Sequence, residues 1–288
     1  EGKQLELGDR ELPPFDEYRI YKNIQEAVMR EEKRKNRRIR MPLFFKWTVA
    51  CAIVLLVIGV GYNFYQSHNE ANLVYREVCA VRGEKLLVLL PDGSRVWLNA
   101  DSKLTYPEQF AKYNRNVTLE GEAYFEIAEN KKSPFQVLAE NVKIQVTGTC
   151  FNVKAYASDK VIKTTLDEGS INIGHVQSRR PMQQMLPGQT AVYEKRSNVI
   201  KIKTDRYHDD ASSWKSNRLI FRNASLKEVL TTLSRHFDIE ITVKNEKIAS
   251  FTYDFVCKGN DLNYVLEVMQ SITPVSFKKI SEYTYTVE

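Results

Sequence analysis

One uninterrupted apolar segment constrains this chain more than any other feature. Residues 47–61 contain no charged side chain, and residues 43–65 contain only Lys46. In an α-helix, about 20 such residues span the hydrocarbon core of a bilayer. The segment therefore predicts one transmembrane helix over residues 43–65, with a helix buried in a protein core as the alternative.

The residues around this segment predict its orientation. Basic and interfacial aromatic side chains flank it: Arg37, Arg38, Arg40, Lys46, Trp47, Tyr62 and Tyr65. Seven Lys or Arg residues occur in the twenty residues before residue 43, and three in the twenty after residue 65. Because basic residues concentrate on the cytoplasmic side, we expect residues 1–42 to be cytoplasmic. The preceding 42 mostly polar residues favour a retained anchor over a cleaved signal peptide.

The basic run at residues 33–40 has two interpretations. It could contact nucleic acid, but its place beside the anchor favours attraction to anionic membrane lipid. We therefore expect lipid contact and no direct binding of nucleic acid.

The composition excludes several other classes of protein. With 43% hydrophobic and 27% charged residues the chain is a folded protein, and a mean hydropathy of −0.41 excludes a multi-pass membrane protein. The motifs of zinc proteases, redox dithiols, nucleotide-binding loops and serine hydrolases are absent from the sequence. We therefore predict no catalytic, cofactor-binding or metal-binding residue. Beyond the anchor, Cys79, Cys150 and Cys257 allow either one disulfide or buried free thiols.

Residues 73–204 have the pattern of a wound all-β domain. Residues 85–90 and 94–98 predict a hairpin, with Pro91, Asp92 and Gly93 as the turn between them. Turn residues separate the further expected strands, which are 116–120, 123–128, 135–146, 151–157, 161–166, 170–173, 191–195 and 199–203. Little helical pattern separates these strands, so we expect sheets throughout this domain.

Three carboxylates are candidates for catalytic residues. Glu120, Glu122 and Glu126 alternate along one expected strand, and neighbours two apart lie at about the spacing of a glycosidase pair. The simpler interpretation is that the intervening Leu119, Gly121, Ala123, Phe125 and Ile127 face the core and the glutamates face water. The second interpretation is favoured.

The C-terminal region, residues 215–288, contains an internal repeat. Residues 223–233 align without gaps on residues 259–269. Ser225 with Glu228 predicts a capping box, and Asp261 an N-cap, so each copy begins a helix. Strands are expected at residues 218–222, 239–243, 251–256, 275–280 and 283–287. These predict a small α+β domain with two βαβ-like units, whose edge strands could dock another strand.

Short motifs in a fixed order give the chain a family resemblance. They contain Pro91, Asp92, Gly93, Asn99, Gly121, Glu122, Phe125, Gly148, Thr149, Phe151, Asn152 and Gly188. In this order and spacing the motifs resemble the FecR family of membrane-bound anti-sigma regulators over about residues 75–195. The C-terminal repeat resembles the domain that ends FecR proteins of Bacteroidetes, which is itself similar to the secretin and TonB short N-terminal domain.

The resemblance implies a function in transmembrane signalling. Residues beyond the anchor would be periplasmic and would sense the signalling domain of a TonB-dependent outer-membrane transporter. The cytoplasmic part would bind an extracytoplasmic-function sigma factor, and regulated proteolysis near the anchor would release it. The family motifs look structural, so the resemblance implies no catalytic residue.

The N-terminal region departs from the family pattern. Family members usually carry a longer anti-sigma region than the 42 residues present here, so this part is either reduced or a fragment. It still predicts a helix, with one face formed by Phe15, Tyr18, Tyr21, Ile24, Gln25 and Val28. That face fits a sigma-binding helix and a helix lying on lipid equally well.

The leading hypothesis is therefore a single-pass, non-enzymatic regulator of the bacterial inner membrane with its N-terminus inside. Its expected parts are a tail (1–42), an anchor (43–65), an all-β domain (73–204) and an α+β domain (215–288). The alternative is an anchored scaffold or binding module of an envelope assembly.

Overall fold

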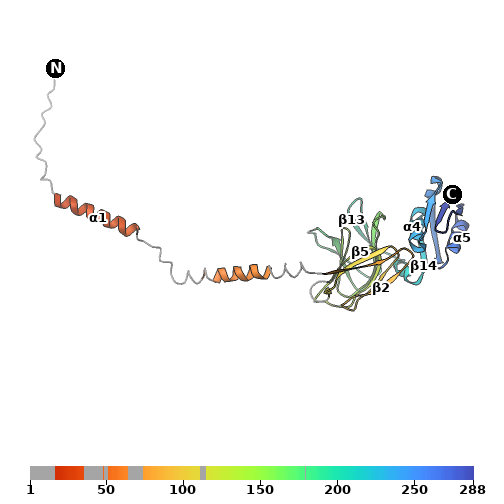
Figure 1. The fold of residues 1–288 in the computed structure, drawn as a ribbon, viewed down its shortest axis with the longest axis horizontal. Coiled ribbons are helices and arrows are strands. Elements are labelled where there is room, and N and C mark those ends of the chain that lie inside the picture. Colours follow the sequence, from red (N-terminus) through yellow and green to blue (C-terminus); the bar gives the residue numbers. More distant parts are fainter. Residues whose placement is uncertain (1–16, 36–47, 49–50, 64–73, 111–114, 179) are drawn as a thin grey trace, which may run out of the picture. The chain divides into compact units, whose positions relative to one another are not determined.

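The computed structural model of the 288-residue chain describes residues 17–35, 48, 51–63, 74–110, 115–178 and 180–288. The chain divides into two compact units, residues 1–71 and 72–288 (Figure 1). Each unit is described by itself.

The first unit contains two helical segments. Helix α1 (Glu17–Lys35) confirms the helix expected in the N-terminal region, and residues 51–63 are also helical. Among the described residues, no helix has both the length and the apolar character needed to cross a bilayer. Residues 43–47, 49–50 and 64–65 of the expected anchor lie outside the described residues, so the transmembrane span stays a prediction.

The expected flanks of the anchor fall mostly in the same undescribed stretches. Only Tyr62 is described, and its side chain is exposed on the helical segment. The flanking residues outside the described part of the chain are Arg37, Arg38, Arg40, Lys46, Trp47 and Tyr65.

Residues 74–204 form an all-β domain, called here the β domain, in which two sheets share one long strand. The shared strand is β5 (Asn116–Glu126). The first sheet has the order β1-β4-β5-β6-β7-β10-β11, with β1 (Tyr75–Ala80), β4 (Ser102–Pro107), β6 (Phe135–Ala139), β7 (Val142–Val146), β10 (Ile171–His175) and β11 (Gln183–Met185). The second has the order β2-β3-β5-β8-β9-β12-β13, with β2 (Leu86–Leu89), β3 (Arg95–Leu98), β8 (Cys150–Ala155), β9 (Val161–Glu168), β12 (Gln189–Glu194) and β13 (Val199–Thr204). Only β5 and β6 pair in parallel among the described strands of this domain.

Strand β5 changes sheets at Gly121. Its first half pairs with β4 and β6, whereas its second half, from Gly121 onward, pairs with β3 and β8. Gly121 has φ +101°, and a Cβ atom there would lie 2.4 Å from Ser102 Oγ and 2.7 Å from Ser102 Cα. Only glycine combines this backbone conformation with so close an approach. The two expected strands at residues 116–120 and 123–128 are therefore one continuous strand.

Other boundaries also differ from those expected. The predicted hairpin is confirmed as β2 and β3, with Gly93 at φ +85° in its turn. The expected strand 135–146 is a hairpin of two strands, β6 and β7, because Glu140 adopts φ 48° between them. Strands β1, β4 and β11 were not expected. Strands β1 and β11 are mostly exposed edge strands that lack a clear apolar alternation, whereas β4 is an inner strand whose buried positions begin with a polar residue, Ser102.

The core of the β domain lies between the two sheets. The inward residues of both sheets are fully buried, and they include Val96, Leu98, Phe125, Phe135 and Phe151. The rings of Phe125 and Phe151 stack with centroids 4.9 Å apart. Aromatic pairs of this kind add to the stabilisation that burial of apolar area provides.

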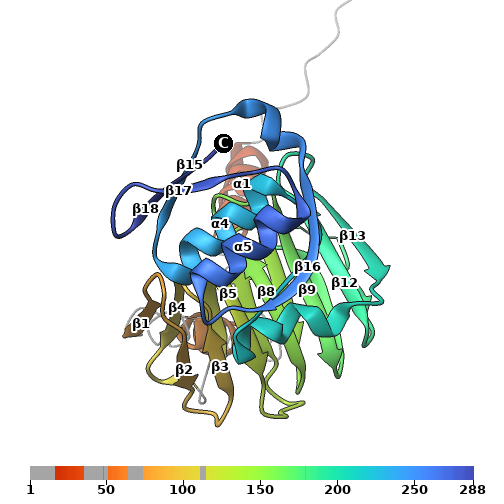
Figure 2. The same cartoon turned by 90° about the vertical axis from the view of Figure 1, so that its right-hand side faces the viewer.

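Residues 218–288 form a second domain, called here the C-terminal domain (Figure 2). It has an apolar core of its own. Its helices are α4 (Leu226–Phe237) and α5 (Leu262–Ile272), and its strands are β14 (Arg218–Ser225), β15 (Glu240–Val243), β16 (Thr252–Lys258), β17 (Phe277–Lys279) and β18 (Thr284–Val287). The short helix η2 (Glu246–Ser250) precedes β16. The predicted N-caps are confirmed, because Ser225 accepts from the Glu228 amide and Asp261 from the Asn263 amide. The reciprocal half of the expected capping box, from the Ser225 amide to the Glu228 side chain, is not formed among the described residues, and Glu228 Oε1 lies 3.9 Å from Lys163 instead.

The expected βαβ-like units are wrong, because each helix connects strands of different sheets. Strand β14 pairs antiparallel with β16, whereas β15 pairs in parallel with β18, which also pairs with β17. The repeat specifies only the local order of strand, helix and strand. Pairing between strands depends on contacts across the whole domain, which the repeat does not encode.

Candidate functional site: the contact between the β domain and the C-terminal domain

A buried carboxylate on the outer side of the second sheet organises the contact between the two domains. Glu122 is 8% exposed, and its backbone amide donates to Ser102 Oγ at 2.8 Å. Asn99 Nδ2 donates to Glu122 Oε2 at 2.9 Å, and Asn152 Nδ2 donates to Glu122 Oε1 at 3.0 Å. Both carboxylate oxygens thus have amide donors, as a buried charge requires.

The three glutamates considered as a catalytic group have separate surroundings. The expectation that all three face water is wrong for Glu122, because the second domain and its connection cover that part of the sheet. Glu120 is exposed and pairs with Lys103 at 3.0 Å. Glu126 pairs with Arg95 at 2.6 Å. The apolar residues expected to face the core are buried as predicted, and they are Leu119, Ala123, Phe125 and Ile127.

A short helix, η1 (His208–Ser216), connects the domains and attaches to this carboxylate cluster. The indole Nε1 of buried Trp214 donates to Asn152 Oδ1 at 3.1 Å, so Asn152 bridges Trp214 and Glu122. Lys85 Nζ donates to the Trp214 carbonyl at 2.7 Å and also to Asn217 Oδ1. Burial lowers the pKa of Lys85, and the charge of Glu122 partly opposes that shift.

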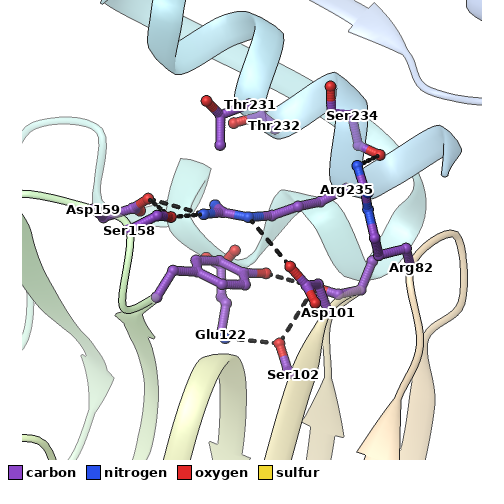
Figure 3. A network of polar contacts seen from close by, with 12 residues as sticks. Arg82, Asp101, Ser102, Glu122, Ser158, Asp159, Thr231, Thr232, Ser234 and Arg235 are labelled. Atoms are coloured by element: carbon purple, nitrogen blue, oxygen red, sulfur yellow. Dashed lines mark hydrogen bonds and ion pairs between the residues drawn. The ribbon is translucent and has the colours of Figure 1, made fainter. Parts of the chain in front are cut away.

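The last turn of helix α4 inserts Arg235 between side chains of the β domain (Figure 3). Its Nη2 donates to Ser158 Oγ at 2.6 Å and to Asp159 Oδ1 at 3.0 Å. Its guanidinium lies 3.6 Å from the centroid of the Tyr156 ring, and its Nε lies 3.8 Å from Asp101 Oδ2. The side chain of Arg235 is 10% exposed, so these contacts are largely shielded from water.

The β domain in turn caps the C-terminal end of α4. Arg82 Nη2 donates to the carbonyls of Ser234 at 2.9 Å and Ile239 at 3.0 Å, and the amide of Gly83 donates to the Arg235 carbonyl at 2.8 Å. The last carbonyls of a helix lack partners within the helix and carry partial negative charge. A cation and an amide from the other domain therefore stabilise this helix end.

These contacts border a cleft of about 400 Å³, called here the interdomain cleft. Its lining comes from the β domain, from the connection and from the C-terminal domain. Its charged side chains are Glu122, Lys154, Lys163, Lys203, Asp205, Asp210, Arg218, Arg222, Glu228 and Arg235. Among the described residues, no cluster of His, Cys, Asp and Glu has the geometry to hold a metal ion.

His236 lies at the edge of the cleft, next to the turn that begins the second repeat. Its Nε2 lies 2.6 Å from the Gly259 carbonyl, to which the ring donates in the tautomer with a proton on Nε2. Burial lowers the pKa of His236, the bond to Gly259 opposes the shift, and the charge of Lys85 adds to it. We therefore expect this imidazole to be neutral at pH 7.

The remaining family-motif residues hold the β domain together away from the cleft. Asp92 accepts from buried Arg115 at 2.5 and 2.8 Å, and Thr149 Oγ1 donates to the Ser170 carbonyl at 3.1 Å. Gly188 has φ +80°, and its carbonyl accepts from the Asp205 amide at 2.8 Å. At Gly148, a Cβ atom would lie 2.9 Å from Glu129 Cα. Pro91 lies in the turn between β2 and β3, and Phe125 and Phe151 lie in the core.

The structure brings together three of the family-motif residues, Asn99, Glu122 and Asn152, at this contact. Their partners from elsewhere in the chain were missed at the sequence level. Arg82, Lys85, Trp214 and Arg235 have no fixed spacing that indicates a shared site. The one available signal is Trp214, a large aromatic residue within a polar stretch between two domains. Which carboxylates Arg235 meets depends on how the domains dock, and sequence patterns do not reveal that.

The described thiols are unpaired and differ in burial. Cys79 is exposed, Cys150 is half-buried and Cys257 is buried. Burial raises the pKa of Cys257, so this thiol stays protonated at neutral pH.

The first unit carries a separate candidate surface on α1. Tyr18, Tyr21, Ile24 and Val28, spaced as one helical face, are between 52% and 80% exposed. Phe15 of the expected face lies outside the described residues. An apolar face this exposed is typical of a surface that another molecule covers.

Comparisons with known proteins match both folded domains. The family described as FecR protein matches residues 77–172, and the family described as FecR, C-terminal matches residues 218–287. Two crystal structures of a candidate anti-sigma factor from Parabacteroides distasonis ATCC 8503, at 2.50 and 1.65 Å resolution, are 26% identical to the chain with a TM-score of 0.68. Each match covers 74% of this chain and 98% of the crystallised one. No curated protein matches the chain. Since both family domains and an entire crystallised relative are matched, the chain belongs to the FecR family of anti-sigma regulators.

Proposed function

We propose that this regulator relays the state of a TonB-dependent outer-membrane transporter to an extracytoplasmic-function sigma factor. The observation that carries the proposal is the match of FecR and FecR C-terminal families to two domains that a shared network joins. The chain is anchored in the inner membrane by residues 43–65, with the N-terminus in the cytoplasm and both folded domains in the periplasm.

The cytoplasmic partner binds the apolar face of α1. The face is formed by Tyr18, Tyr21, Ile24 and Val28, and it has the spacing by which an amphipathic helix occupies a groove on a partner. A protein partner would bind the helix in such a groove, whereas lipid would offer a flat apolar layer. A sigma-binding helix therefore requires a specific protein, whereas a lipid-binding helix would associate with any suitable membrane.

Transmission across the membrane proceeds by regulated proteolysis near the anchor. A partner outside changes the protein only if it prefers one of two states, and a single helix transmits a rigid displacement poorly. If only the state that the partner prefers is cleaved, binding of the partner leads to release of residues 1–42. An uncleavable anchor that still signals normally would rule out this route.

The first experiment is affinity purification of the tagged full-length protein from gently solubilised membranes, with co-purifying proteins identified by mass spectrometry. We expect a sigma factor, with a TonB-dependent transporter when the inducing nutrient is present. Stoichiometric recovery of envelope-assembly proteins without a sigma factor would instead support the scaffold alternative.

Variants of α1 test which surface the sigma factor uses. We expect Ile24→Glu to abolish co-purification of the sigma factor. Asn23→Glu is the matched control, because it adds the same charge on the opposite face of the same exposed helix. Equal recovery with both variants would place the sigma factor elsewhere. If Ile24→Glu loses binding to liposomes but still co-purifies with the sigma factor, the apolar face of α1 binds lipid.

A further inference from the structure

We propose that the interdomain cleft binds a small multivalent anion that carries carboxylate or phosphate groups. The cleft holds about 400 Å³, within the range of sites that enclose small molecules. This inference concerns the cleft alone and goes beyond the proposed binding of a sigma factor and a transporter.

The first observation is a pair of lysines placed directly opposite each other on neighbouring strands. Lys154 of β8 is the register partner of Lys163 of β9, and both side chains line the cleft. Directly opposite side chains have Cβ atoms about 4.5–5.5 Å apart, and like charges in this arrangement are destabilising. Water screens part of this repulsion, because the side chain of Lys163 is nearly half exposed, and an anion bound between the two lysines would relieve the rest.

The protein's own carboxylates compensate this pair only weakly. Glu122 is the register neighbour of Lys154 on β5, but its oxygens face the amides of Asn99 and Asn152, and no ion pair joins it to Lys154 among the described residues. Glu228 of α4 lies 3.9 Å from Lys163, with both side chains nearly half exposed. A contact of that length between exposed groups contributes little.

Two further cations face the cleft without an ion pair among the described residues. Lys203 of β13 is the register partner of Thr190, which in turn pairs with Thr165, so Lys203 lies on the same face of the sheet as the cleft floor. Arg218 lines the opposite wall, on β14.

The other acidic groups of the cleft are committed to neighbours. Asp205 accepts from Thr190 Oγ1 at 3.1 Å and from the Tyr207 amide at 3.0 Å, and Asp210 pairs with Arg222 at 3.1 Å. Of the six Lys and Arg side chains that line the cleft, Arg222 and Arg235 have carboxylate partners and Lys163 has a weak one. The other three cations, Lys154, Lys203 and Arg218, have no ion pair among the described residues. The surplus of donors without acceptors suits charge-assisted hydrogen bonds to an anion with at least two negative groups.

Isothermal titration calorimetry of the full-length protein in mild detergent tests the proposal. The probes are pyrophosphate, the tricarboxylate tricarballylate and a hexaglutamate peptide. We expect pyrophosphate or tricarballylate to bind with a dissociation constant of about 10 μM to 1 mM, and the stronger of the two identifies the anionic group. We expect Lys154→Gln/Lys163→Gln to weaken that binding at least about tenfold.

The matched control is Lys201→Gln. Lys201 is an exposed lysine of the same sheet that pairs with Glu194 at 2.8 Å and lies outside the cleft lining. Thermal melting of each variant checks that it folds. Lys203→Gln provides a second, exposed position if the double variant does not fold.

Three results would overturn the proposal. The first is equal binding by the wild type, the cleft variants and Lys201→Gln, which would indicate nonspecific charge attraction. The second is that neither pyrophosphate nor tricarballylate binds at concentrations up to about 10 mM. The third is binding of hexaglutamate alone, which would assign the cleft to an acidic segment of a protein partner.

Discussion

Arg115 shows how a single charge is held inside the β domain. Its side chain is 1% exposed, and it binds Asp92, which is 7% exposed, at 2.5 Å. Two other donors of its guanidinium reach the carbonyls of Ser133 and Ala128, both at 2.9 Å. The guanidinium of Arg115 thus makes four hydrogen bonds. A buried ion pair of this kind is costly to break, because the remaining partner is left charged without compensation.

We therefore expect Arg115→Met to lower the free energy of unfolding by about 3–5 kcal/mol. Urea denaturation of residues 72–288, the unit that holds both domains, measures the change. The control is Arg95→Met, because Arg95 is 59% exposed in its pair with Glu126 and should cost less than about 1 kcal/mol. Equal costs for the two variants would show that burial of the pair does not determine its contribution.

His236 provides a residue-scale test that depends on pH. Burial lowers its pKa in the folded state, whereas the unfolded chain has a pKa of about 6.5. Between those two values the unfolded state binds more protons, so stability falls as pH drops below about 6.5 and is constant above it.

We expect the wild type to lose its stability advantage over His236→Gln between pH 7.5 and pH 5. The glutamine variant keeps an amide donor near the Gly259 carbonyl but does not titrate. Urea denaturation of both proteins at both pH values gives the difference, in which the other titrating groups cancel. A difference that is independent of pH would contradict a lowered pKa.

At the scale of elements, β5 connects the two sheets of the β domain through one backbone position. Gly121 combines φ +101° with an approach of 2.7 Å between its missing Cβ position and Ser102 Cα. Gly93, in the turn between β2 and β3, has φ +85° with nothing within 4 Å of that position. A substitution at Gly93 therefore introduces backbone strain alone, whereas a substitution at Gly121 introduces both backbone strain and steric overlap.

We expect Gly93→Ala to cost about 1–2 kcal/mol of stability, because it introduces backbone strain alone. Gly121→Ala should cost clearly more, about 3 kcal/mol or above, because Ser102 and the shared strand must also move. Urea denaturation of both variants gives the comparison. If Gly121→Ala costs no more than Gly93→Ala, the close approach is relieved by adjustments that leave the two sheets intact.

At the scale of the whole molecule, the network around Arg235 and Trp214 joins the β domain to the C-terminal domain. Whether the two domains respond to a change as one unit depends on these contacts. Contacts between domains within one chain resemble transient protein interfaces, so their strength decides whether the domains move together.

We expect Arg235→Ala to uncouple the domains, lowering stability by about 3 kcal/mol and splitting one thermal transition into two. Differential scanning calorimetry of residues 72–288 resolves the transitions. Lys227→Ala is the control, since Lys227 lies exposed on the same helix. A single transition at an unchanged midpoint in Arg235→Ala would show that the remaining contacts suffice to couple the domains.

Local sequence patterns predicted much of the fold. The hairpin around Gly93, the caps Ser225 and Asp261 and the helices α1, α4 and α5 all depend on interactions between residues a few positions apart. Propensity, periodicity and turn chemistry encode such interactions directly. The family resemblance was likewise available, because turn residues and core aromatics recur in a fixed order.

The tertiary structure alone decided the candidate site. Glu122 is buried because a domain about one hundred residues later in the chain covers it, and the alternation of its strand predicted exposure. The pairing of β14 with β16 and the insertion of Arg235 beside Asp159 are both long-range contacts. Long-range contacts depend on how packed surfaces fit together, whereas a sequence pattern records only which face of an element is apolar.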